Sequence, residues 1–179
     1  MGAREDFWVF GYGSLMWNPG FPFEAREMAH LHGYHRSLCV FSHVHRGTPT
    51  RPGLVLGLDR GGSCHGVAFK VADADRETAI AYLRAREQVT SIYLERELRL
   101  RLVTGQLVTC LTYIADRRHR QYAGRLPREQ LLEVVAGAVG QSGENPDYVL
   151  RTQAQLLALG VHDADLTWLA EQLAPPIKA

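Results

Sequence analysis

The sequence FWVFGYGSLMW, residues Phe7–Trp17, joins an apolar run directly to a glycine-rich segment. Phe7–Gly11 is short, aromatic and ended by glycine, which is typical of a buried strand that leads into a turn. Glycines in such a turn let the backbone approach a ligand closely and present successive N–H groups to an anion. Gly11–Met16 is therefore a candidate ligand-binding loop, although a simple tight turn explains the glycines alone equally well.

The loop departs from three known glycine motifs. No Gly-Lys-Ser/Thr follows it, so it is not a P-loop, and Met16 stands at the third glycine position of GxGxxG. Met16 also stands where the GxSxG nucleophile elbow around Ser14 would have its last glycine. None of these three activities is therefore indicated by the loop.

Strand features continue from this segment through the first two thirds of the chain. Leu94–Leu102 alternates leucine with charged residues, broken only at Arg96, which is the period of a strand with one solvated face. Thr104-Gly105-Gln106 is typical of a hairpin loop that leads into a second strand, Leu107–Ile114. The other expected strands are rich in Val, Leu or Phe and bounded by turn residues. They are Phe7–Gly11, Ser37–Phe41, Gly53–Leu58 and Gly66–Val71.

Helical features interrupt and then follow the strands. Asp73–Glu87 begins with aspartates, contains helix-forming residues and carries an apolar stripe. In the C-terminal third, helices are expected to start at Pro127, Asn145 and Asp163. This order, strands first and helices later, predicts an α+β domain with an antiparallel, barrel-like sheet.

Length and charge favour one compact domain that binds a small molecule. The chain has 179 residues, of which 46% are hydrophobic, and one domain usually has roughly 100 to 200 residues. We expect this domain over residues 7–173, with short tails at 1–6 and 174–179. A formal net charge of +1 gives no reason to expect nucleic acid or an anionic membrane as a partner. The apolar stretch Phe7–Phe10 is too brief for a signal peptide or membrane span, so we expect a cytoplasmic protein.

Glu87 is the first candidate for chemistry. With Ile80 and Leu83 it follows i, i+3, i+7 spacing, so its carboxyl projects from the apolar face of the helix. Burial raises the pKa of a carboxyl group and makes it an acid and base near neutral pH. The alternative is that the helix ends near Arg86 and Glu87 reaches solvent, and periodicity alone slightly favours this alternative.

Two arginines, Arg46 and Arg51, lie in a proline-containing loop before a strand. Arginine binds carboxylates through two parallel hydrogen bonds, so either side chain can dock an acidic group of a ligand. Exposed loop arginines are more often solvated, and this is the competing interpretation of both.

Histidines and cysteines suggest two other kinds of site. His30-x-His32 and His43-x-His45 each share a strand face, but no third ligand follows at a recognisable spacing, so we expect no metal site. Cys39 lies in an apolar segment, where burial makes a thiol unreactive, and Cys64 and His65 point opposite ways on an extended chain. The cysteines number three and are widely spaced, so we interpret them as buried thiols.

Taken in this order, the segments resemble the ChaC branch of the γ-glutamyl cyclotransferase family. The resemblance covers most of residues 8 to 155, and the YGSL loop with a later helical Glu is its most specific part. The matching stretches are Trp8–Trp17 (WVFGYGSLMW), Gly33–Ser37 (GYHRS), Arg46–Pro49 (RGTP), Pro52–Leu58 (PGLVLGL), Gly66–Phe69 (GVAF), Tyr82–Glu87 (YLRARE), Tyr122-Ala123-Gly124 and Gly140–Val149 (GQSGENPDYV).

The resemblance implies a fold, a reaction and a set of site residues. The fold is a small closed, mainly antiparallel β-barrel with flanking α-helices, and the reaction cleaves glutathione to 5-oxoproline and cysteinylglycine without metal or organic cofactor. Glu87 matches the catalytic glutamate, and Arg46 and Tyr122 match positions of the substrate site. The substrate-binding loop matches Gly11, Tyr12, Gly13, Ser14, Leu15 and Met16.

Some points stay open at the level of sequence. Many relatives carry Gly-Gly-Tyr just after the catalytic Glu, whereas this chain has Gln88–Tyr93 (QVTSIY) there. The alternatives to glutathione turnover are cyclisation of γ-glutamyl amino acids or γ-glutamylamines, and binding of glutathione without turnover. The oligomeric state is not fixed by the sequence, and a monomer is compatible with it.

Overall fold

The computed structural model describes residues 6–88 and 91–175, and the chain forms two compact units. The first unit comprises Met1–Arg36 with Gly57–Asp116, and the second comprises Ser37–Leu56 with Arg117–Ala179. Within the described residues, no helix is long and apolar enough to span a membrane. The expectation of one domain over residues 7–173 stays a prediction.

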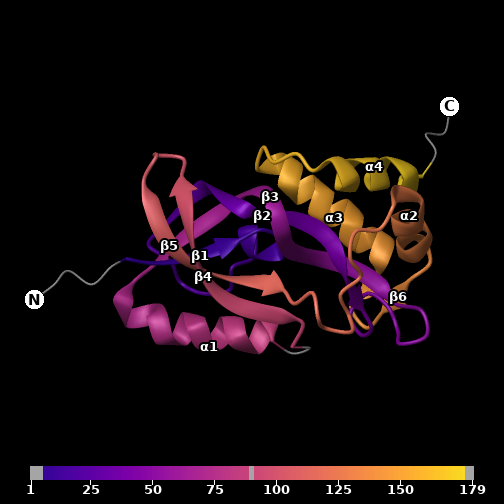
Figure 1. The fold of residues 1–179 in the computed structure, drawn as a ribbon, viewed down its shortest axis with the longest axis horizontal. Helices are drawn as coiled ribbons and strands as arrows, with labels where there is room; N and C mark the ends of the chain where they lie inside the picture. Colours follow the sequence, from indigo (N-terminus) through magenta and orange to yellow (C-terminus); the bar gives the residue numbers. More distant parts are fainter. Residues whose placement is uncertain (1–5, 89–90, 176–179) are drawn as a thin grey trace, which may run out of the picture. The chain divides into compact units, whose positions relative to one another are not determined.

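Five strands form a closed barrel in the order β1-β3-β2-β4-β5 (Figure 1). β1 pairs antiparallel with β3 and parallel with β5, and this last pairing closes the barrel. β4 pairs antiparallel with both β5 and β2. The α+β class and the mainly antiparallel barrel are therefore confirmed. The bounds are β1 Phe7–Gly11, β2 Ala25–Ser42, β3 Gly53–Val71, β4 Tyr93–Leu102 and β5 Leu107–Ala115.

Two strands are longer than the sequence predicted. The expected strand Ser37–Phe41 is only the end of β2, and the two expected strands Gly53–Leu58 and Gly66–Val71 are parts of β3. The segment between these two parts is polar and contains Gly61 and Gly62, with φ of 99° and 65°. Residues that carry a side chain rarely adopt such positive φ angles, so glycines at these two positions let the strand continue through this segment.

Helix α1, Arg76–Glu87, follows a short 3₁₀ turn at Asp73–Asp75 and runs alongside the barrel strands (Figure 1). Ala79 and Leu83 of the predicted apolar stripe are fully buried. Complete burial of one leucine stabilises the fold by about 1.5 to 3 kcal/mol. This burial fixes which face of α1 turns to the barrel.

Three helices pack on one another in the second unit (Figure 1): α2 Arg128–Ala136, α3 Asn145–Ala158 and α4 Ala164–Leu173. Asp163 caps α4 as predicted, because its Oδ1 accepts from Leu166 N at 3.0 Å. Asn145 does not cap α3: it is the first residue of the helix, and its side chain accepts from Leu54 N and donates to Leu54 O, both at 2.8 Å. A short hairpin of β6 Val139–Gly140 and β7 Gly143–Glu144 precedes α3.

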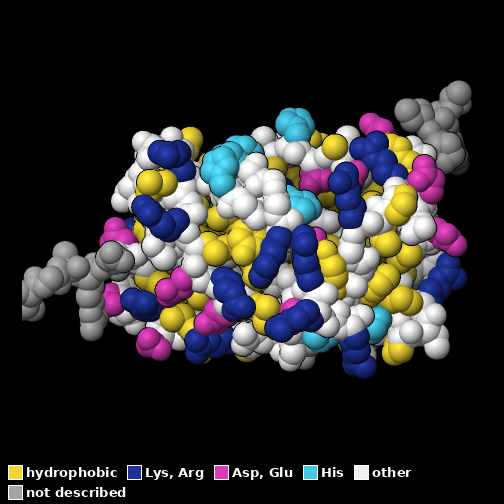
Figure 2. Space-filling view, viewed as in Figure 1, with side chains coloured by type: hydrophobic (Ala, Val, Ile, Leu, Met, Phe, Trp, Pro, Cys, Tyr) yellow, Lys and Arg dark blue, Asp and Glu magenta, His cyan; other side chains and the backbone are white. Residues whose placement is uncertain are grey.

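Histidines of β2 and β3 stack on one another, and Figure 2 shows several His side chains (cyan) on the face viewed. The rings of His30 and His65 are parallel, with centroids 4.1 Å apart, and His32 lies 4.2 Å from His30. The Nε2 of His30 is buried and has no hydrogen-bond partner among the described residues. Burial, and then the charges of His65 and His32, lower the pKa of His30 below its ordinary value of 6.5.

We predict that this stack lowers the free energy of unfolding in mild acid. Because the pKa of His30 is lower in the folded state, the unfolded chain binds the proton more tightly, and the loss begins as pH falls below about 6.5. Urea unfolding between pH 5 and 8 should show a smaller acid loss for His30→Gln than for the wild type. The matched control is His162→Gln at an exposed position. An equal acid loss in all three proteins would contradict the prediction.

Candidate active site

The Gly11–Met16 loop leaves β1 and turns at once into a 3₁₀ helix, Ser14–Met16. Met16 N donates to Gly13 O at 2.9 Å, and Asn18 N donates to Ser14 O at 2.8 Å. The side chains of Leu15 and Met16 are buried, whereas Ser14 is exposed and Gly13 is half-buried. The loop is thus held in the barrel through Leu15 and Met16 and presents Gly13 and Ser14 outward.

Gly11 is required by the packing of the chain on itself. A Cβ at this position would lie 2.9 Å from Leu15 Cβ and 3.2 Å from Met16 N. A Cβ on Gly66 of β3 would in turn lie 2.4 Å from Gly11 O. These two glycines therefore let β1, the loop and β3 pack closely against one another. A glycine at position 11 was expected to make room for a ligand, but in the structure it makes room for Leu15 and Met16 of the same chain.

Arg36, near the middle of β2, is a buried arginine that holds the loop from the barrel side. Its Nε donates to Tyr12 O, and its Nη2 donates to His65 O at 2.7 Å and lies 3.7 Å from Met16 Sδ. Charged donors make stronger hydrogen bonds than neutral ones, and burial makes their loss costly. No role was predicted for Arg36 from the sequence. A lone arginine just before the apolar run Ser37–Phe41 was the available signal.

Glu87 is the last residue of α1, and Gln88 N closes the helix by donating to Arg84 O at 3.0 Å. The Glu87 side chain is only 17% exposed, so the alternative of a solvated carboxylate is wrong although the helix does end there. Burial raises the pKa of Glu87, and Arg86, whose Nε lies 3.6 Å from Glu87 Oε1, partly opposes this. A carboxyl group in this setting can both accept and donate a proton near neutral pH.

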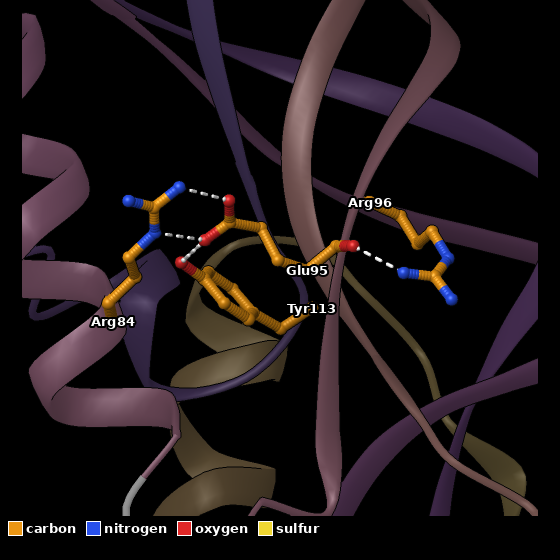
Figure 3. A network of polar contacts seen from close by, with 4 residues as sticks. All are labelled: Arg84, Glu95, Arg96 and Tyr113. Atoms are coloured by element: carbon orange, nitrogen blue, oxygen red, sulfur yellow. Dashed lines mark hydrogen bonds and ion pairs between the residues drawn. The ribbon is translucent and has the colours of Figure 1, made fainter.

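A polar network links α1 to β4 and β5 (Figure 3). Arg84 of α1 donates through Nε and Nη2 to the two carboxylate oxygens of Glu95 at 2.9 and 2.8 Å. The Tyr113 hydroxyl donates to Glu95 Oε2 at 2.8 Å, whereas Arg96 turns to the Glu95 backbone carbonyl. Burial raises the pKa of Tyr113, and the nearby charges of Glu95 and Glu87 add to this. Tyr113 is therefore within electrostatic reach of Glu87.

The alternation in β4 did not predict this network. It placed Glu95 on the solvated face of the strand with Glu97 and Arg99, but Glu95 is partly covered and paired to α1 through Arg84. Which part of a strand a helix covers depends on contacts between residues far apart in the sequence.

Arg46 and Tyr122, the other predicted substrate residues, belong to the second unit. Arg46 Nη1 donates to Glu144 O at 3.2 Å, and its guanidinium lies 5.4 Å from the centroid of the Tyr148 ring. Tyr122 forms an isolated antiparallel bridge with Val40 of β2. These contacts give both residues a packing function in that unit, and their assignment to the substrate stays a prediction.

The cysteines are buried, as expected. Burial raises the pKa of Cys110 to about 12, which leaves its thiol protonated and unreactive at neutral pH. Cys64 Sγ lies 3.6 Å from the backbone carbonyl of His65. In the part of the chain that the structure describes, no group of three His, Cys, Asp or Glu side chains is placed to hold a metal ion. Val89 and Thr90, within the segment that replaces Gly-Gly-Tyr, lie outside the described residues.

Comparisons with known proteins agree with the fold. The chain is 35% identical over 159 residues to the glutathione-specific γ-glutamylcyclotransferase of Escherichia coli, covering 89% of this chain and 69% of that protein. It is 34% identical to γ-glutamylcyclotransferase 2-3 of Arabidopsis thaliana, covering 93% and 87%. A solved yeast γ-glutamyl cyclotransferase specific to glutathione superposes with a TM-score of 0.82 at 22% identity, covering 95% and 96% of the two chains.

The family model for ChaC-like proteins matches residues 7–174. With the barrel, the YGSL loop and Glu87 at the end of α1, this match shows that the chain belongs to the ChaC-like protein family.

Proposed function

We propose that the chain is a glutathione-specific γ-glutamyl cyclotransferase, which converts glutathione to 5-oxoproline and cysteinylglycine. The observation that carries this proposal is the buried carboxyl of Glu87, one residue from the arginine that holds the Gly11–Met16 loop. The relative in Escherichia coli, named as glutathione-specific, and the plant relative, named as a γ-glutamylcyclotransferase, support it. In the same proposal, Gly11–Met16 binds the γ-glutamyl group.

The chemistry of a γ-glutamyl bond needs no nucleophile from the protein. The α-amine of the donor attacks its own γ-carbonyl carbon, so one C–N bond forms in a five-membered lactam as the bond to the cysteinyl nitrogen breaks. The barrier lies in deprotonating the α-ammonium, folding a flexible chain into the attack conformation and protonating the leaving amine. Electrons and atoms balance without water or a redox partner.

Glu87 performs both proton transfers in this proposal. Its carboxylate accepts the proton from the α-ammonium, and its carboxylic acid then gives that proton to the departing cysteinyl nitrogen. Because burial raises the pKa of Glu87, the two protonation states lie closer in energy near neutral pH than for a solvated glutamate. One group can therefore act as base and then as acid within a single turnover.

The loop supplies hydrogen-bond donors for the oxyanion of the tetrahedral intermediate. We assign this role to the N–H groups of the segment Tyr12–Leu15, whereas Met16 N–H donates to Gly13 O. One well-placed backbone donor stabilises such an oxyanion by about 3 kcal/mol. The outward position of Gly13 and Ser14 supports this part of the proposal.

Purified protein incubated with glutathione, and followed for 5-oxoproline and cysteinylglycine in equal amounts, tests the activity. γ-Glutamyl amino acids and γ-glutamylamines serve as competing substrates in parallel reactions. Faster turnover of either class than of glutathione would show that this class is the preferred substrate. Saturable glutathione binding without 5-oxoproline would instead favour a binding protein.

Replacement of Glu87 by Gln should lower kcat/KM by about 10²- to 10⁴-fold, because the amide keeps the shape but cannot transfer the proton. In the wild type, kcat/KM should fall as pH drops through the pKa of Glu87, above the ordinary carboxyl value of 4.5. The measurement is a pH profile of 5-oxoproline release from both proteins. Retention of most of the activity in Glu87→Gln would end the assignment.

The same substitution should stabilise the fold at neutral pH. A pKa raised in the folded state means that ionisation of Glu87 costs stability as pH rises through that pKa, and Gln avoids this cost. The difference in Tm between Glu87→Gln and wild type should therefore grow from pH 4 to pH 8. A constant difference over this range would show that Glu87 is not destabilised by its surroundings.

Arg46 is proposed to pair with a carboxylate of glutathione, since desolvated carboxylates need cationic partners. Loss of one charge-assisted hydrogen bond, worth roughly 1.5 to 3 kcal/mol, predicts about a 10- to 150-fold lower kcat/KM for Arg46→Ala. Arg46→Lys should lose less, because it keeps the charge but not the planar fork. Arg151→Ala, a 77% exposed arginine in the same unit, is the control. A change in Tm with kcat/KM within about twofold of wild type would assign Arg46 to packing alone.

A further inference from the structure

Arg86, the residue before Glu87, contacts four groups of the first unit. Its Nη2 donates to Ser14 Oγ at 2.6 Å, and its Nη1 donates to Asn18 O at 2.7 Å. Nη1 also donates to the Tyr82 hydroxyl at 3.1 Å, and Nε lies 3.6 Å from Glu87 Oε1. One guanidinium therefore joins the loop, the end of α1 and the carboxylate assigned to proton transfer.

We propose that Arg86 is a positioning residue, which fixes the Gly11–Met16 loop against the last turn of α1 and stabilises the ionised carboxylate of Glu87. This inference rests on the proposed function, because it assigns Arg86 to the step in which Glu87 accepts a proton. Arg86 transfers no proton itself, since a guanidinium stays protonated throughout the pH range of interest.

The shape of the arginine side chain suits this arrangement. A guanidinium presents five N–H donors in a planar fork, and Arg86 directs three different nitrogens to the loop, to the helix and toward Glu87. The contact with Ser14 Oγ is short at 2.6 Å, and the Arg86 side chain is 21% exposed although Ser14 itself lies at the surface. A lysine would keep the charge but would lose the simultaneous contacts with Ser14 and Asn18.

The charges around Glu87 define the electrostatic part of the role. On α1, Arg86 opposes the burial that raises the pKa of Glu87. On β5, the charge of Glu87 adds to the burial that raises the pKa of Tyr113, whose hydroxyl donates to Glu95 of β4. Arg84 already pairs with Glu95 through two hydrogen bonds and holds the pKa of Glu95 below its usual range. Loss of Arg86 therefore leaves the burial of Glu87 without the positive charge that opposes it.

A purely structural role of Arg86 makes a different prediction. If Arg86 only packs the loop against α1, its replacement lowers kcat/KM by the same factor at every pH. If it also stabilises the Glu87 carboxylate, its replacement by a neutral residue raises the pKa of Glu87. The acid limb of the profile then moves to higher pH, because Glu87 must be ionised to accept the proton.

The test compares Arg86→Gln and Arg86→Lys with wild type. In Arg86→Gln the acid limb of kcat/KM for glutathione should move up by about one pH unit or more, the effect of one opposite charge at this distance. At pH 7 its kcat/KM should fall by about tenfold or more, since it also loses the contact with Ser14. Arg86→Lys should keep the wild-type limb and still lose kcat/KM at every pH.

Arg76→Gln is the matched control, because it removes the same charge from the same helix. Arg76 lies eleven positions before Glu87 on α1, a separation of about 16 Å along the helix axis. At physiological ionic strength, salt largely screens the interaction of two charges at this distance. Its pH profile should coincide with that of the wild type.

Titration of the Glu87 side-chain carboxyl by ¹³C NMR, assigned by the signal lost in Glu87→Gln, gives its pKa without turnover. This separates the two proposals: a wild type that makes no 5-oxoproline overturns the function, while the NMR titration still tests Arg86. A higher Glu87 pKa in Arg86→Gln than in Arg76→Gln supports the inference. An unchanged Glu87 pKa, or equal losses of kcat/KM at every pH in Arg86→Gln, overturns it. If Arg86→Gln does not fold, a shifted acid limb in Arg86→Lys overturns it as well.

Discussion

The docking of α1 on the barrel draws one carboxyl group, that of Glu87, out of water. Burial of Ala79 and Leu83 sets the rotation of the helix, and Glu87 follows on the same face one turn later. Burial destabilises the ionised form of Glu87 and so raises its pKa. The raised pKa makes the group a usable acid and base. Arg86 contacts both this carboxyl group and Ser14 of the neighbouring loop.

Two arginines from different elements, one on β2 and one on α1, hold the Gly11–Met16 loop. The buried Arg36 of β2 donates to the Tyr12 carbonyl, and Arg86 of α1 donates to the Ser14 hydroxyl. Since Gly11 has no room for a side chain, the loop has few ways to shift. A preorganised loop needs no reorganisation when charge develops on the substrate, and such sites are the most effective at stabilising an oxyanion.

Local patterns were sufficient to predict the elements that carry the site. The i, i+3, i+7 spacing placed Glu87 on the buried face, and the apolar run before two glycines identified β1 and its loop. They failed where a contact between distant residues overrides the local preference. Asn145 was expected to cap a helix but bonds Leu54 of β3, and Gly61 and Gly62 lie within β3 where two separate strands were expected. Arg86, Arg36 and Glu95 carry no local signature of their partners, so their roles became visible only in three dimensions.

Turnover of glutathione in water enriched in ¹⁸O tests the central claim most directly, because cyclisation and hydrolysis place oxygen differently. The account predicts equal amounts of 5-oxoproline and cysteinylglycine, with no ¹⁸O in the 5-oxoproline, since the lactam oxygen comes from the original γ-carbonyl. Release of glutamate carrying ¹⁸O in its γ-carboxyl group would show attack by water and contradict the account.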